Sequence, residues 1–297
     1  MRRLSASVVA VLAFIFVSSS ILLAQEYAVR LSGEGKRGDK YRLSATGQHA
    51  EMMTVFVGNV AVNQKNDEFS VELVSTFAVM EADATGKAIS YTLGIEKCLI
   101  STGGITKPLI PPGTVVTATK EGNRIVLKNN GLPVDPMTVK ALSVVIPSHV
   151  SGLSDDDVFG TRDKKRVGDT WEINADLAAK SLKEEFNVST DKGDVKGSST
   201  LEGVVKGAQE GYLIVSAWLS VDNFSLPLPE GVKIQDGQVR SLFSGKFPIN
   251  EDRAPIGQSA KMMMSFTALG PPNPNMPQMT IQGTMGRSLT REFEPLE

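Results

Sequence analysis

The chain has 297 residues, 41% of them hydrophobic and 22% charged, which is the balance of a globular protein and not of a disordered one. Its 31 basic and 33 acidic side chains give a formal net charge of −2. Removing residues 1–24, which hold two arginines and no acid, leaves 29 basic against 33 acidic side chains and a charge of −4. This balance argues against nucleic acid or an anionic membrane surface as a partner.

The N-terminal segment has the pattern of a secretory signal peptide. Arg2 and Arg3 form a positive region, residues 8–17 are an unbroken apolar run, and Ala24 is a small residue at a suitable cleavage position. We therefore expect residues 1–24 to be a signal peptide cleaved near Ala24, and the mature protein to be exported to the periplasm or out of the cell. The alternative is an uncleaved membrane anchor, because the apolar stretch approaches the roughly 20 residues that a spanning helix needs.

Alternation of apolar and polar residues dominates the rest of the chain and predicts half-buried strands. Gly122-Asn123 has the residue types of a two-residue hairpin turn between two strands within residues 114–129. The fold class expected is therefore mainly β. Apolar residues that share one face of a predicted strand are Tyr41, Leu43 and Ala45; Phe69, Val71, Leu73, Phe77 and Val79; Leu213, Val215, Ala217, Leu219 and Val221; Met262, Met264 and Phe266; and Met279, Ile281 and Met285.

Cys98 is the single cysteine, so no intramolecular disulfide can form even though export permits one. It lies in the apolar run SYTLGIEKCLIS, where a buried thiol is more common than a nucleophile. The fold must therefore be stabilised by packing without a covalent cross-link.

Helical patterns are sparse. Residues 135–146 begin with Asp135 as a candidate cap and Pro136 at the first helical position, and their apolar residues follow helical spacing. Residues 174–186 begin with Asn174 as a candidate cap and carry a second apolar stripe. Each segment predicts one short helix.

A short motif occurs twice. KRGDKYRLSA at residues 36–45 matches KRVGDTWEINA at residues 165–175 once Val167 is taken as an insertion. Each copy predicts a tight Gly-Asp turn leading into a strand whose first inward side chain is a large aromatic ring. The first copy contains the Arg-Gly-Asp tripeptide of adhesion ligands, but the second copy lacks it, so adhesion is not the shared purpose. The repeated structural residues are Gly38, Asp39, Tyr41, Gly168, Asp169 and Trp171.

The repeat suggests an internal duplication. The polar, mixed-charge residues 151–166 predict a linker, so we expect an N-terminal β lobe over residues 25–150 and a C-terminal β lobe over residues 167–297. Two similar lobes of curved antiparallel sheet, each with a short helix, would give this pattern. One large sheet made of two similar halves would give it as well.

Residues suited to catalysis or metal binding are few. His49 and His149 are the only histidines, and no zinc site can be completed without carboxylates that the sequence does not place. Asp155-Asp156-Asp157 lacks the oxygen ligands that a calcium loop needs further along. Met262-Met263-Met264 raises copper binding, but its alternation is typical of sheet packing. We therefore expect no catalytic, cofactor-binding or metal-binding residues.

The order of motifs resembles a family of exported bacterial proteins known as a domain of unknown function with a VGDTW motif. The resemblance implies curved antiparallel sheets with a helix against one face, similar to bacterial lipoprotein-carrier folds. It implies no catalytic residues, and lipid binding on the concave face is an analogy of fold alone. The matching residues are Gly38, Tyr41, Gly122, Gly131, Pro133, Gly168, Asp169, Thr170 and Trp171.

The sequence therefore predicts an exported, non-enzymatic protein. We expect it to bind an apolar ligand, such as a lipid, or an envelope protein through a sheet face or an inter-lobe groove, because adaptable methionines lie on one face of the predicted strands. One alternative is a structural or assembly protein of the envelope that binds no small ligand and contacts its partner through a sheet edge. Another is a hydrolase that uses carboxylates, since any pair of acids can converge in the fold.

Overall fold

The computed structural model describes residues 25–31, 37–82, 88–122, 124–146, 153–206, 211–250, 256–271 and 277–296. The segment expected to be a signal peptide, residues 1–24, and His149 lie outside the described residues. Within the described ranges, no helix has both the length and the apolar character needed to cross a bilayer.

The described chain forms one antiparallel sheet of 13 strands, which confirms the mainly β prediction. The strands run in the order β7-β6-β5-β3-β2-β1-β13-β12-β11-β10-β9-β8, and β4 pairs with β3. They are β1 (Lys40–Val57), β2 (Val60–Ala82), β3 (Ala88–Thr102), β4 (Ile105–Pro108), β5 (Val115–Glu121), β6 (Arg124–Asn129), β7 (Leu132–Pro133), β8 (Thr170–Glu172), β9 (Val195–Lys206), β10 (Gly211–Val221), β11 (Lys233–Pro248), β12 (Gly257–Leu269) and β13 (Met279–Pro295).

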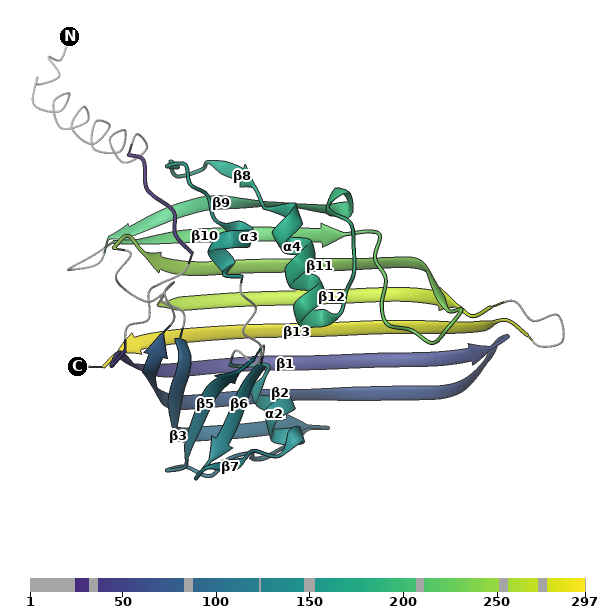
Figure 1. Cartoon of the computed structure of the whole chain (residues 1–297). Coiled ribbons are helices and arrows are strands. Elements are labelled where there is room, and N and C mark those ends of the chain that lie inside the picture. The colour runs from purple at the N-terminus through teal and green to yellow at the C-terminus, as the bar shows by residue number, and fades with distance from the viewer. Residues whose placement is uncertain are drawn as a thin grey trace, which may run out of the picture.

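The two halves of the chain share this sheet without a break. β1 from the first half pairs along its length with β13 from the second half, and the two lie side by side at the middle of the sheet (Figure 1). The strands are unusually long: β2 has 23 residues, which at about 3.3 Å per residue extends roughly 75 Å. Of the two arrangements that the sequence left open, this is a single large sheet.

Side-chain alternation gives the sheet two unlike faces. In β10 the residues Leu213, Val215, Ala217, Leu219 and Val221 are all buried, as their spacing predicted, while Trp218 between them is exposed. We call the face that carries the buried residues the inner face and the opposite one the outer face. The strands form because each supplies an apolar row to the same side.

In the described part of the chain, three helices lie over the inner face: α2 (Pro136–Leu142), α3 (Asp155–Phe159) and α4 (Ala175–Phe186) (Figure 1). Both predicted caps are present, since the Asp135 side chain accepts from Thr138 N and the Asn174 side chain accepts from Leu177 N. A short 3-10 turn, η1 (Lys192–Asp194), precedes β9.

Helix α3 lies in the segment where the sequence indicated a polar linker. Ser154 and Asp157 form a reciprocal capping box, which satisfies backbone donors at the helix start. The Asp156 carboxylate then accepts a hydrogen bond from Leu31 N at 2.9 Å, which ties α3 to the N-terminal segment. Ser-x-x-Asp is the local sequence signal for this helix, which the polar, mixed-charge composition of the segment conceals.

The core consists of three apolar clusters on the inner face. One lies under α2 in the first half, one under α4 in the second half, and one joins the N-terminal residues Val29 and Leu31 to β10 and β11. Leu73, Leu93 and Leu142 in the first cluster have no exposed surface. Over these three clusters the inner face is therefore covered by the protein's own helices and N-terminal segment.

Cys98 belongs to the first cluster, and burial raises the pKa of its thiol to about 11. We expect iodoacetamide at pH 8 to alkylate the native thiol at least roughly 100-fold more slowly than the urea-unfolded chain, because the thiolate is the reactive form. Mass spectrometry of the adduct measures both rates. Thr102→Cys in a Cys98→Ser background is the control, since Thr102 is exposed on the same strand. Rapid alkylation of native Cys98 would contradict the buried position.

Candidate functional site

The first predicted Gly-Asp turn leads into β1. Gly38 has a φ of +96°, a left-handed conformation that favours glycine. Its N–H donates to Val79 O at 2.9 Å, and Val79 N donates to Asp39 O at 2.9 Å. Tyr41 is half-buried, its ring meets Phe293 edge-on with centroids 6.3 Å apart, and its hydroxyl donates to the Asp39 carboxylate at 3.1 Å. Burial and the neighbouring Asp39 charge raise the pKa of Tyr41 to about 12.

The second turn repeats the same backbone pattern ahead of β8. Gly168 has a φ of +93°, its N–H donates to Leu201 O at 2.8 Å, and Leu201 N donates to Asp169 O at 3.1 Å. Trp171 is buried, and its indole N–H donates to Phe159 O at 2.8 Å. The two aromatic rings therefore differ in burial. β1 lies at the centre of the sheet and β8 at its end, so the fold does not gather the six repeated residues into one site.

An apolar stripe crosses the outer face from β10 to β1. Trp218 pairs with Leu242, and Met263 on the next strand lies diagonal to Leu242, whose direct partner there is Lys261. Met263 and Ala50 both pair with Gly286 of β13. Met52 lies two residues beyond Ala50 on the same face. The large side chains are 45 to 58% exposed. We define the apolar stripe as Trp218, Leu242, Met263, Ala50 and Met52; its four strand spacings cover about 19 Å.

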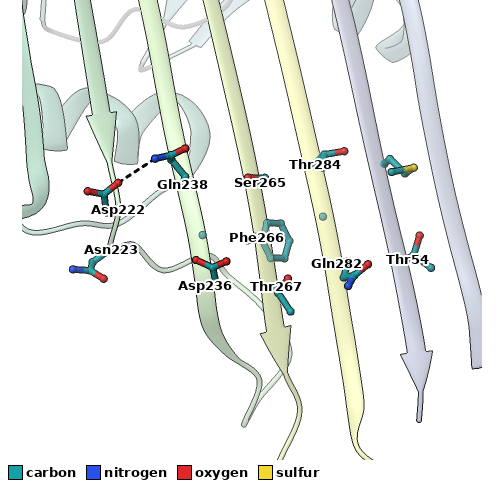
Figure 2. Close-up of a pocket in the computed structure, with 13 residues that line it drawn as sticks. Thr54, Asp222, Asn223, Asp236, Gln238, Ser265, Phe266, Thr267, Gln282 and Thr284 are labelled. Carbon is teal, nitrogen blue, oxygen red and sulfur yellow. Dashed lines mark hydrogen bonds between the residues drawn. The ribbon is translucent and has the colours of Figure 1, made fainter. Parts of the chain in front are cut away.

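A polar groove of about 710 Å³ adjoins the stripe on the outer face. Figure 2 shows its side chains arranged across β11, β12, β13 and β1, with the Gln238 amide donating to the Asp222 carboxylate at 3.3 Å. Met52 belongs to both the stripe and the groove wall. Hydroxyls, amides and carboxylates dominate the rest, including Thr54, Asp222, Asp236, Gln238, Ser265 and Thr284.

The inner face carries a cluster of charged residues beside α2. His49, Glu51 and Asp67 each bring a potential ligand atom, and these atoms lie within 4.8 Å of one another. Lys65 donates to Glu51 at 2.9 Å, and Lys140 of α2 forms an ion pair with Asp67. We call these five residues the charge cluster. It forms because β1 and β2 place Glu51 directly opposite Asp67, and like charges in that position need compensating cations.

His49 is the buried member of the charge cluster. Its side chain is only 7% exposed, its ring lies 5.0 Å from the Phe69 ring between centroids, and neither ring nitrogen has a hydrogen-bond partner. Burial lowers the pKa of His49, and the positive charge of Lys140 lowers it further. The hydrogen bond from Lys140 holds the pKa of Asp67 below its usual range. Near neutral pH the ring is therefore uncharged and the carboxylate ionised.

No local pattern in the sequence indicates the charge cluster, because Glu51 and Asp67 lie on different strands and meet only through the register of β1 and β2. One local signal existed: Gly58-Asn59 joins β1 to β2 as a two-residue turn, and Gly58 has a φ of +59°. Met262 and Met264, considered above as copper ligands, are buried in the cluster under α4. Their alternation therefore reflects packing of the sheet, as the sequence pattern indicated.

Comparisons with known proteins found structural likenesses only, and these have low TM-scores. No protein-family model matches the chain, and no curated protein does either. A structure concerning lipid–protein interactions in lipovitellin has a TM-score of 0.37 and 12% identity, and it covers 89% of this chain but only 26% of lipovitellin. P47 from Clostridium botulinum A2 has a TM-score of 0.17 and 8% identity over 86% of this chain and 81% of P47.

The outer membrane protein OprG from Pseudomonas aeruginosa has a TM-score of 0.15 and 6% identity, over 88% of this chain and 98% of OprG. The chain spans about a quarter of the length of lipovitellin, the first of these structures. All three TM-scores lie under 0.5, so these likenesses carry no argument.

Proposed function

We propose that this is an exported, non-enzymatic protein that binds a protein of the cell envelope through the outer face of its sheet. The observation that carries the proposal is the apolar stripe. Trp218, Leu242 and Met263 expose about half of each side chain on the face opposite the helices. Exposed apolar patches of this kind mark interaction sites on soluble proteins.

The inner face supports this choice of surface. The apolar side chains of its three clusters are covered by α2, α3, α4 and the N-terminal segment, and Leu73, Leu142 and Val145 are fully buried. A small apolar ligand on that face would have to displace side chains packed at the density of a protein interior. The outer face needs no such rearrangement to receive a partner.

The shape and composition of the stripe favour a protein over a lipid. Sites for small ligands are concave and enclose most of the ligand surface, whereas the stripe lies across the pleat of an extended sheet. Tryptophan, methionine and arginine are enriched in protein interfaces, and Arg240 pairs with Met263 beside the stripe. Asp222 and Asp236 line the adjoining groove, so a partner with a basic flank next to its apolar surface fits best.

Site-specific photo-crosslinking tests this proposal. A benzophenone maleimide is attached to Ser265→Cys in a Cys98→Ser background, because Ser265 is exposed on the outer face beside Met263. Irradiation with the envelope fraction of the source cells should give a discrete protein adduct. Trp218→Ser with Leu242→Ser should reduce its yield at least about tenfold, since buried interface anchors contribute 2 kcal/mol or more.

The control carries Ile105→Ser, which removes an even more exposed apolar side chain on β4, far from the stripe. Its adduct yield should equal that of the unchanged chain. Adducts that persist when the stripe is removed would overturn the proposal. Adducts formed with lipid alone, identified by mass, would instead assign the outer face to an apolar ligand.

A further inference from the structure

We propose that His49, Glu51 and Asp67 form a binding site for a divalent transition-metal ion of the zinc class. This site lies on the inner face, separate from the apolar stripe, and does not depend on the function proposed for that stripe. One imidazole and two carboxylates are ligand types that zinc accepts, and three protein ligands leave a further position for water.

The ligand atoms are already near the spacing that a metal requires. Tetrahedral bonds of 2.0 to 2.2 Å place neighbouring ligand atoms roughly 3.4 Å apart. His49 Nε2 lies 3.8 Å from Glu51 Oε2, and all three ligand atoms fall within 4.8 Å of one another. Side-chain rotations that move the ligand atoms by about 1 Å would bring them to the spacing of a tetrahedral site. The backbone of β1 and β2 needs no change because Glu51 and Asp67 are direct cross-strand partners.

His49 is the residue that ion pairing alone does not explain. Lys65 and Lys140 compensate the two carboxylates, and they would suffice for a purely structural cluster. The imidazole nevertheless lies buried with two nitrogens that lack hydrogen-bond partners. An unsatisfied buried polar group costs free energy, and a metal bound at Nε2 would satisfy one of the two nitrogens.

The two lysines compete with a metal but can leave the site. Their side chains are 54% exposed for Lys65 and 40% exposed for Lys140, so each ammonium group can move into water when a cation replaces it. His49 Nδ1 has no acceptor to orient the ring, and such outer contacts typically contribute 10- to 100-fold in metal affinity. We therefore expect a micromolar site and not a nanomolar one.

Titration of the purified chain with Zn²⁺ against a chromophoric chelator tests the site. We expect one bound ion per chain. Glu51→Gln and Asp67→Asn should each weaken binding at least about tenfold, because each removes an anionic ligand. Lys140→Met should tighten binding several-fold, since it removes the cation that holds Asp67. A purely structural ion pair predicts no gain in zinc affinity from that variant.

Two further measurements keep the result independent of folding defects. Glu68→Gln is the matched control, because Glu68 is exposed beside Asp67 and points to the other face. The chain has only two histidines, so Zn²⁺ should shift one set of ring signals in NMR spectra, and that set should remain in His149→Gln. Absence of binding at about 100 µM Zn²⁺, which is roughly 100-fold above a micromolar dissociation constant, would overturn the assignment. Binding that is unchanged in both ligand variants would overturn it as well.

Discussion

Replacing Trp171 with alanine should lower the free energy of unfolding by about 3 to 5 kcal/mol, the usual cost of removing a buried tryptophan. The ring packs in the cluster that joins the N-terminal segment to β10 and β11, and Lys165 Nζ lies 5.8 Å from its centroid. Its N–H also holds the end of α3 through Phe159 O. Urea unfolding followed by circular dichroism measures the loss.

Two comparison variants separate the contributions to this effect. Trp171→Phe keeps most of the ring volume and loses the hydrogen bond, and Ser199 Oγ still donates to Phe159 O at 2.8 Å. We expect it to cost about 1 kcal/mol. Tyr41→Ala should cost less than Trp171→Ala because Tyr41 is only half-buried. An unchanged unfolding curve for Trp171→Ala would remove Trp171 from the core.

Replacing Gly47 with valine should destabilise the protein by about 3 kcal/mol, at the upper end of the range for overpacking. A Cβ at Gly47 would lie 2.6 Å from Val144 Cγ1 and 3.0 Å from both Val144 O and Val145 Cγ1. Both valines are buried and stiff, so the turn after α2 must lift from β1. Urea unfolding measures this loss too.

Gly286→Ala is the matched control for that change. Gly286 lies on the neighbouring strand, and a Cβ there would meet no atom within 4 Å. Alanine restricts the unfolded chain more than glycine does, so this variant should be neutral or more stable by up to about 1 kcal/mol. Equal losses of unfolding free energy in Gly47→Val and Gly286→Ala would show that the sheet tolerates no side chain at either glycine. The close contact of Gly47 with the turn after α2 would then not explain the effect.

Local patterns predicted much of the fold because they report which side of an element is buried. The alternation from Leu213 to Val221 and the caps Asp135 and Asn174 appear in the structure as expected. Helix α3 was missed because its single turn has almost no apolar periodicity, and its capping box is the only strong local signal. The domain boundaries and the duplication remain predictions, since both halves share one sheet.

The candidate sites could not be predicted in the same way. The apolar stripe depends on the pairing of β1 with β13, which joins residues from opposite ends of the chain. No local pattern encodes such a pairing, because its register is set by how two long apolar faces meet across the whole sheet. Each exposed side chain alone, such as Leu242, looks like an ordinary surface residue.

The sequence by itself determined that this chain is β-rich, free of disulfides and supplied with two equivalent Gly-Asp turns. Only the tertiary structure decided that Glu51 faces Asp67. The β1–β2 turn pairs Val57 with Val60, and that register would place Asp67 opposite Ala50 on the outer face. A bulge between Val55 and Phe56 shifts the register by one residue. Because side chains alternate between faces, that shift turns Asp67 inward, beside His49.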